Sequence, residues 1–255
     1  KSFWIIYNTK NYWHMRIFHI ITHFDIGGAE RVAVNIAKSP TVGMEYHLVE
    51  VVRGNGEFSQ SFIKELHDCG ICFHRSHITN NKIAIILFPL WFIYLSFKWK
   101  PQIIHTHTEI PDLSIYLWYK MFGWIFPGTK YVRTIHNTEL WNQWPQIGCK
   151  VEAFFKKRHA NIAISQSTQL CYKQIYGEIP QIIFNGLQSV KQNKFEYIIA
   201  NKINILFAGR LEYQKGVDQL IEVVNALKYN SKFYFHIVGN GSMKDFWIES
   251  IYRRF

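Results

Sequence analysis

Cysteine is scarce in this chain of 255 residues, and its four cysteines are too scattered to form a disulfide framework. Cys69 and Cys72 form a C-x-x-C pair, but no second ligand pair follows at matching spacing. We therefore expect them to bind no zinc and to pack as small apolar residues at a helix-to-strand junction. The sequence also lacks an arginine-rich run, an aromatic RNA-binding motif and zinc-finger spacing, which places nucleic acid last among its partners.

Positive charge is abundant, with a net charge of +11. This excess favours an anionic partner, for which nucleotide phosphates and an anionic lipid surface both qualify. An ordinary basic, soluble surface would give the same net charge, so charge alone does not choose between these alternatives.

The longest hydrophobic run, residues 83–97, is shorter than the roughly 20 residues that span a bilayer, and Pro89 interrupts it. We do not expect a transmembrane helix there. Its aromatic side chains and the following Lys98 and Lys100 suit a helix that lies on an anionic membrane surface. A helix buried against a sheet fits equally well, and both hold if one face packs inward.

Short apolar segments alternate with helical ones, which predicts an α/β fold with a parallel sheet covered on both faces. We expect a helix over residues 29–38, whose apolar stripe consists of Ala29, Val32, Ala33 and Ile36. The expected strands are 16–22, 46–52, 71–75, 102–107, 130–135, 161–164 and 181–184, and, after a polar stretch, 203–208 and 233–238. The predicted domains are 15–187 and 188–255.

The segment from Ile205 to Val217 reads as a strand, a cationic turn and a helix. Arg210 follows the strand directly, and Lys215 and Gly216 precede the helix. A helix amino terminus repels cations, so local stability does not explain this pair, whereas a bound diphosphate would. The alternative is two ordinary solvated charges.

Several glycines and histidines fall at the carboxyl ends of strands, where parallel sheets bind ligands. Gly27, Gly28, His107 and His136 are among them. His105 and His107 are two apart and share a face, but a metal site would need a third ligand, so packing or hydrogen bonding to a sugar is favoured. His136 is either a satisfied core residue or part of the same cleft.

Seven short motifs occur in a fixed order along the chain. They are I-T-H-F-D-I-G-G-A-E-R (21–31), P-Q-I-I-H-T-H (101–107), T-I-H-N (134–137), A-I-S-Q (163–166), I-F-N-G-L (183–187), G-R-L-E-Y-Q-K-G (209–216) and I-V-G-N-G (237–241). Together they resemble the retaining GT-B glycosyltransferases, specifically the large family four group. The resemblance implies two Rossmann-like parallel-sheet domains.

The resemblance also implies an activity, the transfer of a sugar from a UDP- or GDP-linked donor to a glycan or lipid-linked glycan acceptor with retention of configuration, as in capsular or surface polysaccharide synthesis. No cofactor beyond the nucleotide sugar and no metal is expected. A non-catalytic GT-B binding or scaffold subunit is the alternative. A dinucleotide oxidoreductase is disfavoured because Lys244 stands where the third fingerprint glycine would be.

By the same resemblance, Arg210 and Lys215 are expected to stabilise the departing diphosphate, and His107 to orient the reacting sugar. The remaining expected donor contacts are Gly27, Gly28, Gly239 and Asn240. Glu30 and His136 are assigned to the acceptor side.

The two ends of the chain carry further expectations. Residues 1–14 are expected to be an upstream extension, because Met15 opens the first strand. The second domain is expected to be incomplete, since a doubly wound domain needs about 100 residues and the family's Glu-x₇-Glu motif is not reached, so the chain alone is expected to be inactive. Without a signal-peptide pattern, a cytoplasmic location is expected, with peripheral contact at the inner face of the membrane.

Overall fold

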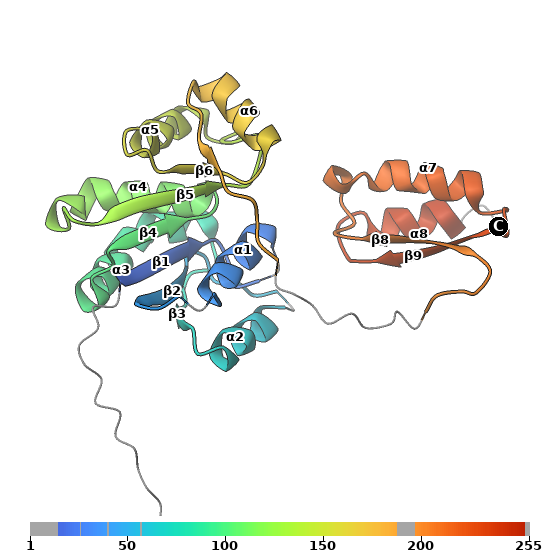
Figure 1. Ribbon diagram of the computed structural model, residues 1–255, viewed down its shortest axis with the longest axis horizontal. Helices are drawn as coiled ribbons and strands as arrows, with labels where there is room; N and C mark the ends of the chain where they lie inside the picture. The colour runs from blue at the N-terminus through green and yellow to red at the C-terminus, as the bar shows by residue number, and fades with distance from the viewer. Residues whose placement is uncertain (1–14, 26, 40, 57, 188–196, 253–255) are drawn as a thin grey trace, which may run out of the picture. The chain divides into compact units, whose positions relative to one another are not determined.

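The protein is described by a computed structural model covering residues 15–25, 27–39, 41–56, 58–187 and 197–252 (Figure 1). It divides into two compact units, Lys1–Ser189 and Val190–Phe255. The expected extension at 1–14, position 26 of the glycine-rich motif and the start of the expected second domain at 188 lie outside the described residues.

The first unit contains a seven-stranded, all-parallel sheet in the order β3-β2-β1-β4-β5-β6-β7 (Figure 1). Its strands are β1 (Met15–Ile21), β2 (Met44–Glu50), β3 (Cys72–His74), β4 (Ile103–Thr106), β5 (Lys130–Ile135), β6 (Asn161–Ala163) and β7 (Gln181–Ile182). Every strand expected in this unit is present, and the predicted parallel α/β sheet is confirmed. The sheet order reverses between β1 and β4, which makes that pair the topological switch point.

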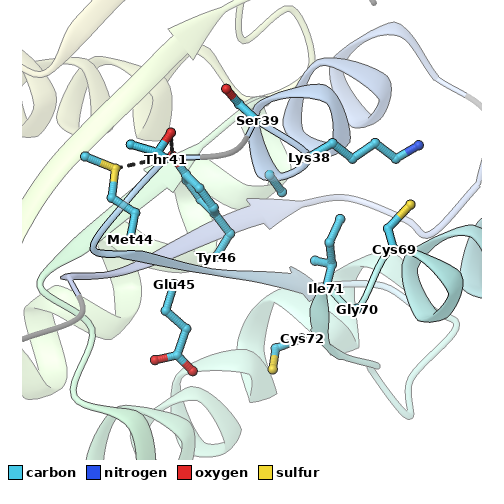
Figure 2. A pocket seen from close by; sticks show the side chains of 11 residues that line it. Lys38, Ser39, Thr41, Met44, Glu45, Tyr46, Cys69, Gly70, Ile71 and Cys72 are labelled. Carbon is cyan, nitrogen blue, oxygen red and sulfur yellow. Dashed lines mark hydrogen bonds between the residues drawn. The ribbon is translucent and has the colours of Figure 1, made fainter. Parts of the chain in front are cut away.

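The C-x-x-C pair lies at the junction between α2 (Ser59–Asp68) and β3, as predicted. The prediction that its cysteines pack as small apolar residues is wrong, because both are exposed and border a surface hollow of about 900 Å³. Figure 2 shows their thiols pointing in different directions. Phe62 and Leu66 of α2 fill the core at this corner instead, which leaves the thiols accessible.

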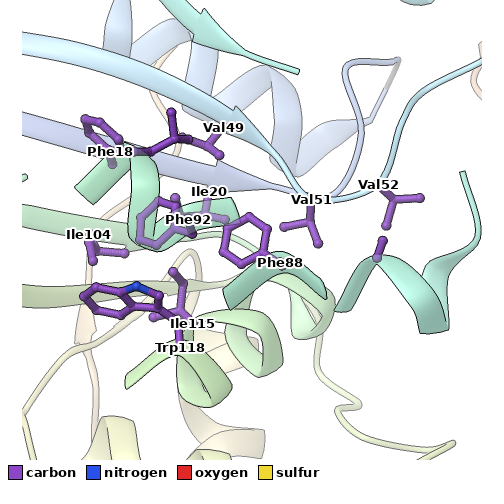
Figure 3. Close-up of a cluster of buried hydrophobic side chains, with 12 residues drawn as sticks. Phe18, Ile20, Val49, Val51, Val52, Phe88, Phe92, Ile104, Ile115 and Trp118 are labelled. Carbon is purple, nitrogen blue, oxygen red and sulfur yellow. The ribbon is translucent and has the colours of Figure 1, made fainter. Parts of the chain in front are cut away.

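Helices cover both faces of the sheet. On one face α1 (Gly28–Ala37) and α2 bury Ala33, Val34, Phe62 and Leu66 against β1 and β2. On the other face α3 (Asn81–Trp99) and α4 (Glu109–Phe122) pack aromatic side chains against Phe18 and Ile20 of β1, as Figure 3 shows. A short 3₁₀ helix, η1 (Gly123–Ile125), follows α4, and the remaining helices of this unit are α5 (Pro145–Lys156) and α6 (Gln166–Tyr176).

Helix α3 has one buried and one exposed apolar face. Its 19 residues continue through Pro89, which is itself buried, and packing offsets the hydrogen bond that the proline cannot donate. Within the described part of the chain, α3 alone is long and apolar enough to cross a membrane. The buried face, which includes Phe88 and Phe92, packs into the core, as expected of a helix that contacts the sheet. The exposed apolar side chains are Ile83, Ile86, Leu87, Leu90, Tyr94 and Phe97.

A buried ionic network joins the sheet to three helices. Arg133 of β5 is 1% exposed and lies between two carboxylates, with 2.7 Å from Nε to Oδ2 of Asp112 and 2.7 Å from an NH1 nitrogen to Oε2 of Glu152. Glu152 also accepts hydrogen bonds from Trp141 Nε1 at 2.6 Å and from the Tyr172 hydroxyl at 2.5 Å. The network ties α4, α5 and α6 to β5, and nothing in the sequence pattern predicted it.

The second unit is a short α/β element. Two parallel strands, β8 (Ile203–Ala208) and β9 (Phe233–Val238), confirm both predictions made for this region. The 3₁₀ helix η2 (Tyr213–Lys215), α7 (Val217–Leu227) and α8 (Lys244–Tyr252) complete it. Leu211, Val217 and Ile221 form a small core with Trp247, so α7 and α8 pack on the two strands.

Candidate functional site

The switch point between β1 and β4 carries a cluster of polar side chains at the carboxyl edge of the sheet. The hydroxyls of Thr22 and Thr108, which follow β1 and β4, are 2.7 Å apart. Gly27, Gly28 and His107 belong to these same two strand-to-helix connections. The structure therefore brings the predicted glycine loop and the predicted histidine to neighbouring strand ends, where ligands bind in such sheets.

Three histidines form a hydrogen-bonded chain across this edge. His19 Nδ1 is 2.9 Å from His107 Nε2, and His107 Nδ1 is 3.4 Å from His136 Nε2. His19 and His107 are fully buried, whereas His136 is partly exposed. His107 thus lies at the predicted place, but its two ring nitrogens face other histidines, and His136 is the member of the chain that solvent can reach.

Burial keeps these rings neutral near pH 7. It lowers the pKa of His19 to about 3 and that of His136 to about 4. It also lowers the pKa values of His105 and His107 far below the usual range, with nearby histidines adding a smaller effect. A neutral imidazole has one donor and one acceptor, so each ring in the chain fixes the tautomer of the next.

The direction of this chain follows from His19. Its Nε2 is buried and has no hydrogen-bond partner among the described residues. A buried N–H without a partner is rarer than a bare acceptor, so we place the proton of His19 on Nδ1, where it is donated to His107. His107 then donates from Nδ1 to His136 Nε2. His136 consequently carries its proton on Nδ1.

His19 is the third histidine that the sequence argument about His105 and His107 lacked. Ligand atoms of all three lie within 4.8 Å of one another. His19 and His105 are register partners in the β1–β4 pairing, which spacing along a single strand does not reveal. All three rings are buried and no carboxylate belongs to their group, so a dication there would be poorly compensated. A metal-free reaction remains our prediction.

A hollow of about 550 Å³ opens beside these histidines on the α1 face. His105 and Thr134 border it, and His105 Nε2 is 2.8 Å from the Thr134 hydroxyl oxygen. Its other walls include Asn35 of α1 and residues 183–187 of the I-F-N-G-L motif. The motif that follows β7 therefore lines the same hollow as His105.

Glu30 occupies the space next to Gly27. A Cβ added to Gly27 would lie 2.0 Å from Glu30 Oε2, whereas one added to Gly28 would have no atom within 4 Å. The Glu30 carboxylate thus folds back over the amino end of α1, where the helix dipole favours negative charge. Gly28 leaves open space at that same end.

The predicted cationic turn of the second unit is present. Arg210 follows β8, Lys215 ends η2, and Gly216, with φ of 68°, caps α7 in the left-handed region that glycine favours. Arg210 is 58% exposed, and its Nη1 lies 3.4 Å from Oε1 of Glu212, which is a weak contact. Lys215 is exposed as well. Both cations therefore lie between the carboxyl end of β8 and the amino end of α7.

The turn after β9 packs closely against this cationic turn. Gly239 has φ of 152°, and a Cβ there would lie 1.8 Å from the carbonyl oxygen of Gly209. The backbone N–H of Leu211 donates to the carbonyl of Asn240 at 2.9 Å. Gly239 and Asn240, predicted to face a nucleotide base, thus belong to one backbone assembly with Arg210.

Comparison with known proteins identifies the family. A family model described as Glycosyltransferase Family 4 matches residues 26–189. The chain belongs to glycosyltransferase family 4. A second model, described as Glycosyl transferases group 1, matches residues 189–254. A search of curated proteins gave no match.

Solved structures place this family 4 chain among GT-B glycosyltransferases. Anabaena HepE in complex with UDP-glucose superposes with a TM-score of 0.70 at 16% identity, over 94% of this chain and 65% of HepE. A Rickettsia africae glycosyltransferase gives 0.62 at 17%, over 94% and 70%. Staphylococcus aureus TarM, in a complex that contains UDP, gives 0.61 at 13%, over 94% and 75%. These matches confirm the predicted GT-B fold, and the chain spans about two thirds of HepE.

Proposed function

We propose that this family 4 chain takes part in the transfer of a sugar from a UDP- or GDP-linked donor to a glycan or lipid-linked glycan. The transfer retains the configuration of the sugar and belongs to capsular or surface polysaccharide synthesis. The observation that carries the proposal is the cationic turn, in which Arg210 and Lys215 lie beside the amino end of α7. Two exposed cations at a helix amino terminus are suited to a diphosphate.

In this reaction, the bond between the anomeric carbon and the diphosphate oxygen breaks while a bond from the anomeric carbon to an acceptor oxygen forms, and the proton of the acceptor hydroxyl passes to the departing diphosphate. Negative charge develops on the departing diphosphate, and fixed cations stabilise it. Arg210 and Lys215 take this role, and the backbone at Gly239 and Asn240 contacts the base. No metal is assigned to this step.

The amino-terminal unit provides the acceptor side of the proposal. His136, which is partly exposed, presents Nδ1–H as a donor toward a sugar hydroxyl, and His107 orients His136 from behind. Gly27 and Gly28 let the backbone at the start of α1 approach the donor closely. Glu30 binds the acceptor.

Replacing Arg210 by alanine should weaken UDP and UDP-glucose binding by about 10- to 100-fold, since a hydrogen bond to a charged group contributes about 1.5–3 kcal/mol. Lys215→Ala should have a similar effect. Because Arg210 is 58% exposed and Lys215 is also exposed, the free energy of unfolding should change by less than about 0.5 kcal/mol in either variant. Isothermal titration calorimetry measures the affinities.

Lys232→Ala is the matched control, because Lys232 is an exposed cation at the opposite, amino end of β9. It should bind like the wild type. The proposal fails if the chain binds neither UDP nor GDP nucleotides, or if Arg210→Ala and Lys232→Ala bind them equally well.

The proposed location is cytoplasmic, with peripheral contact at the inner face of the membrane through α3. The support is its exposed apolar face, where Ile86 is 66% and Leu90 is 55% exposed, together with Lys98 in its last turn and Lys100 at its end. Apolar insertion combined with lysines suits an anionic lipid surface.

Leu90→Glu should abolish cosedimentation with phosphatidylglycerol vesicles, because it places a charge in the centre of the exposed apolar face. Ile175→Glu, at a 59% exposed position of α6, should not. Equal cosedimentation of the wild type and both variants would rule out α3 as the contact, as would equal binding to phosphatidylcholine vesicles.

A further inference from the structure

A second cluster of potential ligands lies on β2 and β3, where His47 is the register partner of Phe18, the residue before His19. Glu45 and His47 are near the amino end of β2, and Cys72 opens β3 next to His47. A carboxylate oxygen, a ring nitrogen and the thiol sulfur of these three residues lie within 4.8 Å of one another. They come from the face of the sheet that α3 covers, since Trp99 at the end of α3 packs edge-on against His47 with 4.5 Å between ring centroids.

Glu45 and His47 of β2 each direct one atom at the cluster, and each forms a hydrogen bond through another atom to a residue outside it. His47 Nε2 is 3.1 Å from Oε1 of Glu45, while His47 Nδ1 is 2.9 Å from His74 Nε2. The second oxygen of Glu45, Oε2, accepts a hydrogen bond from Arg16 Nε at 3.0 Å. Bound metals in proteins have such outer partners, which orient the ligands.

We propose that Glu45, His47 and Cys72 bind a Zn²⁺ ion, with Oε1, Nε2 and Sγ as ligands and a water molecule in the fourth position. Thiolate, imidazole and carboxylate form a donor set that zinc accepts. Two nitrogen or oxygen ligands on a tetrahedral zinc ion are about 3.3 Å apart, close to the observed separation of His47 Nε2 and Glu45 Oε1.

Charge and exposure suit this ion better than they would at the buried histidines. A thiolate and a carboxylate balance the two charges of zinc. The His47 side chain is fully buried, but Glu45 is 32% exposed and Cys72 is exposed, so the ion has an entry path. Figure 2 shows the Glu45 carboxylate and the Cys72 thiol on the same side of the strands, whereas the Cys69 thiol points away from them.

Proton balance requires two changes on binding. The Cys72 thiol releases its proton to solvent, and the neutral His47 ring carries its proton on Nδ1, which donates to His74 Nε2, so that Nε2 is free for the metal.

In this site the C-x-x-C pair has a different role from the one it has in a zinc finger. Only Cys72 is a ligand, and its partners come from the neighbouring strand rather than from a second cysteine pair. Because the ligands lie at the amino ends of β2 and β3, opposite the carboxyl edge, the ion is structural and joins the outermost strand to the sheet. The inference is independent of the proposed sugar transfer.

The test is zinc titration of the chelator-treated full chain, followed by native mass spectrometry and calorimetry. The wild type and Cys69→Ser should bind one zinc ion with equal affinity. Cys72→Ser should bind it about a hundredfold more weakly or worse, and His74→Phe, which removes only the outer partner, about 10- to 100-fold more weakly. With Co²⁺ in place of zinc, a thiolate-to-cobalt charge-transfer band should appear in the wild type and in Cys69→Ser, and not in Cys72→Ser.

A measurement on the wild type alone covers the case in which a variant misfolds. Zinc should protect Cys72 from a thiol reagent and leave Cys69 reactive, as read by peptide mapping. The proposal is overturned if the wild type does not bind zinc, or if folded Cys72→Ser binds it as tightly as the wild type. It is also overturned if Cys69→Ser loses as much affinity as Cys72→Ser, or if zinc fails to slow the reaction of Cys72 relative to that of Cys69.

Discussion

Lowering the pH from 6.5 to 5 should destabilise the amino-terminal unit by about 5 kcal/mol, because His19, His105 and His107 are buried and neutral when folded but become charged when unfolded. A folded-state pKa below the unfolded value means that the unfolded chain binds more protons. The contribution to stability is therefore complete above about pH 6.5 and is lost as the pH falls toward the folded pKa values, about 3 for His19.

Other titrating groups act within this pH window. Burial lowers the pKa values of His74 and His136 to about 4 and also lowers the pKa of His47, so these rings add to the acid destabilisation. Burial raises the pKa of Asp112 to about 7 against the opposing charge of Arg133, so folded Asp112 holds a proton that the unfolded chain has lost, and acid favours folding there. Asp112 offsets about one of these added histidines, so the three buried histidines set a lower bound of about 5 kcal/mol on the effect.

Urea unfolding between pH 7 and 5, followed by the fluorescence of buried Trp118 and Trp141, measures this effect. His19→Gln should reduce the pH dependence by about 1.5 kcal/mol, the contribution of one buried neutral histidine. The matched control is His67→Gln, because the His67 side chain is 84% exposed and should contribute almost nothing. A stability that stays constant from pH 6.5 to 5 would contradict the assignment of neutral, buried rings.

Arg133→Met should cost about 3–5 kcal/mol of unfolding free energy, since it leaves Asp112 and Glu152 buried without their cation. The same change at a partly exposed pair provides the control. Arg31 is 43% exposed and lies 2.6 Å from Glu65, so Arg31→Met should cost less than about 1 kcal/mol.

A double variant separates charge from packing in this network. Glu152→Gln added to Arg133→Met removes the ionised carboxylate that Arg133 had compensated and should recover part of the lost stability. If Arg133→Met and Arg31→Met cost the same, or if the double variant is no more stable than Arg133→Met, the ionic account of the network is wrong.

Strand positions were predictable because buried parallel strands are short apolar runs bounded by polar turns. The cationic turn was predictable for the same reason, since Arg210, Lys215 and Gly216 are neighbours in sequence and local chemistry defines them. The roles assigned to Arg210, Lys215, His107 and the glycines remain predictions, because placement in the fold is not a measurement of binding.

Side-chain partners across strands were not predictable from the same sequence. His19 meets His107, and Arg133 meets Asp112 and Glu152, only because the strands adopt the order β3-β2-β1-β4-β5-β6-β7. Spacing along one strand shows which residues share a face, as it did for His105 and His107, but not which strand lies alongside. The potential co-ligands of Cys72 could not be predicted for this reason, since they belong to β2.

The contact between Gly209 and Gly239 limits how this protein could be redesigned. With no room for even a methyl group between the two turns, neither backbone can shift without carrying the other along. If this turn contacts the base as proposed, attempts to change nucleotide preference should vary the side chain at Asn240, which is exposed, and keep Gly239, where a Cβ has no room.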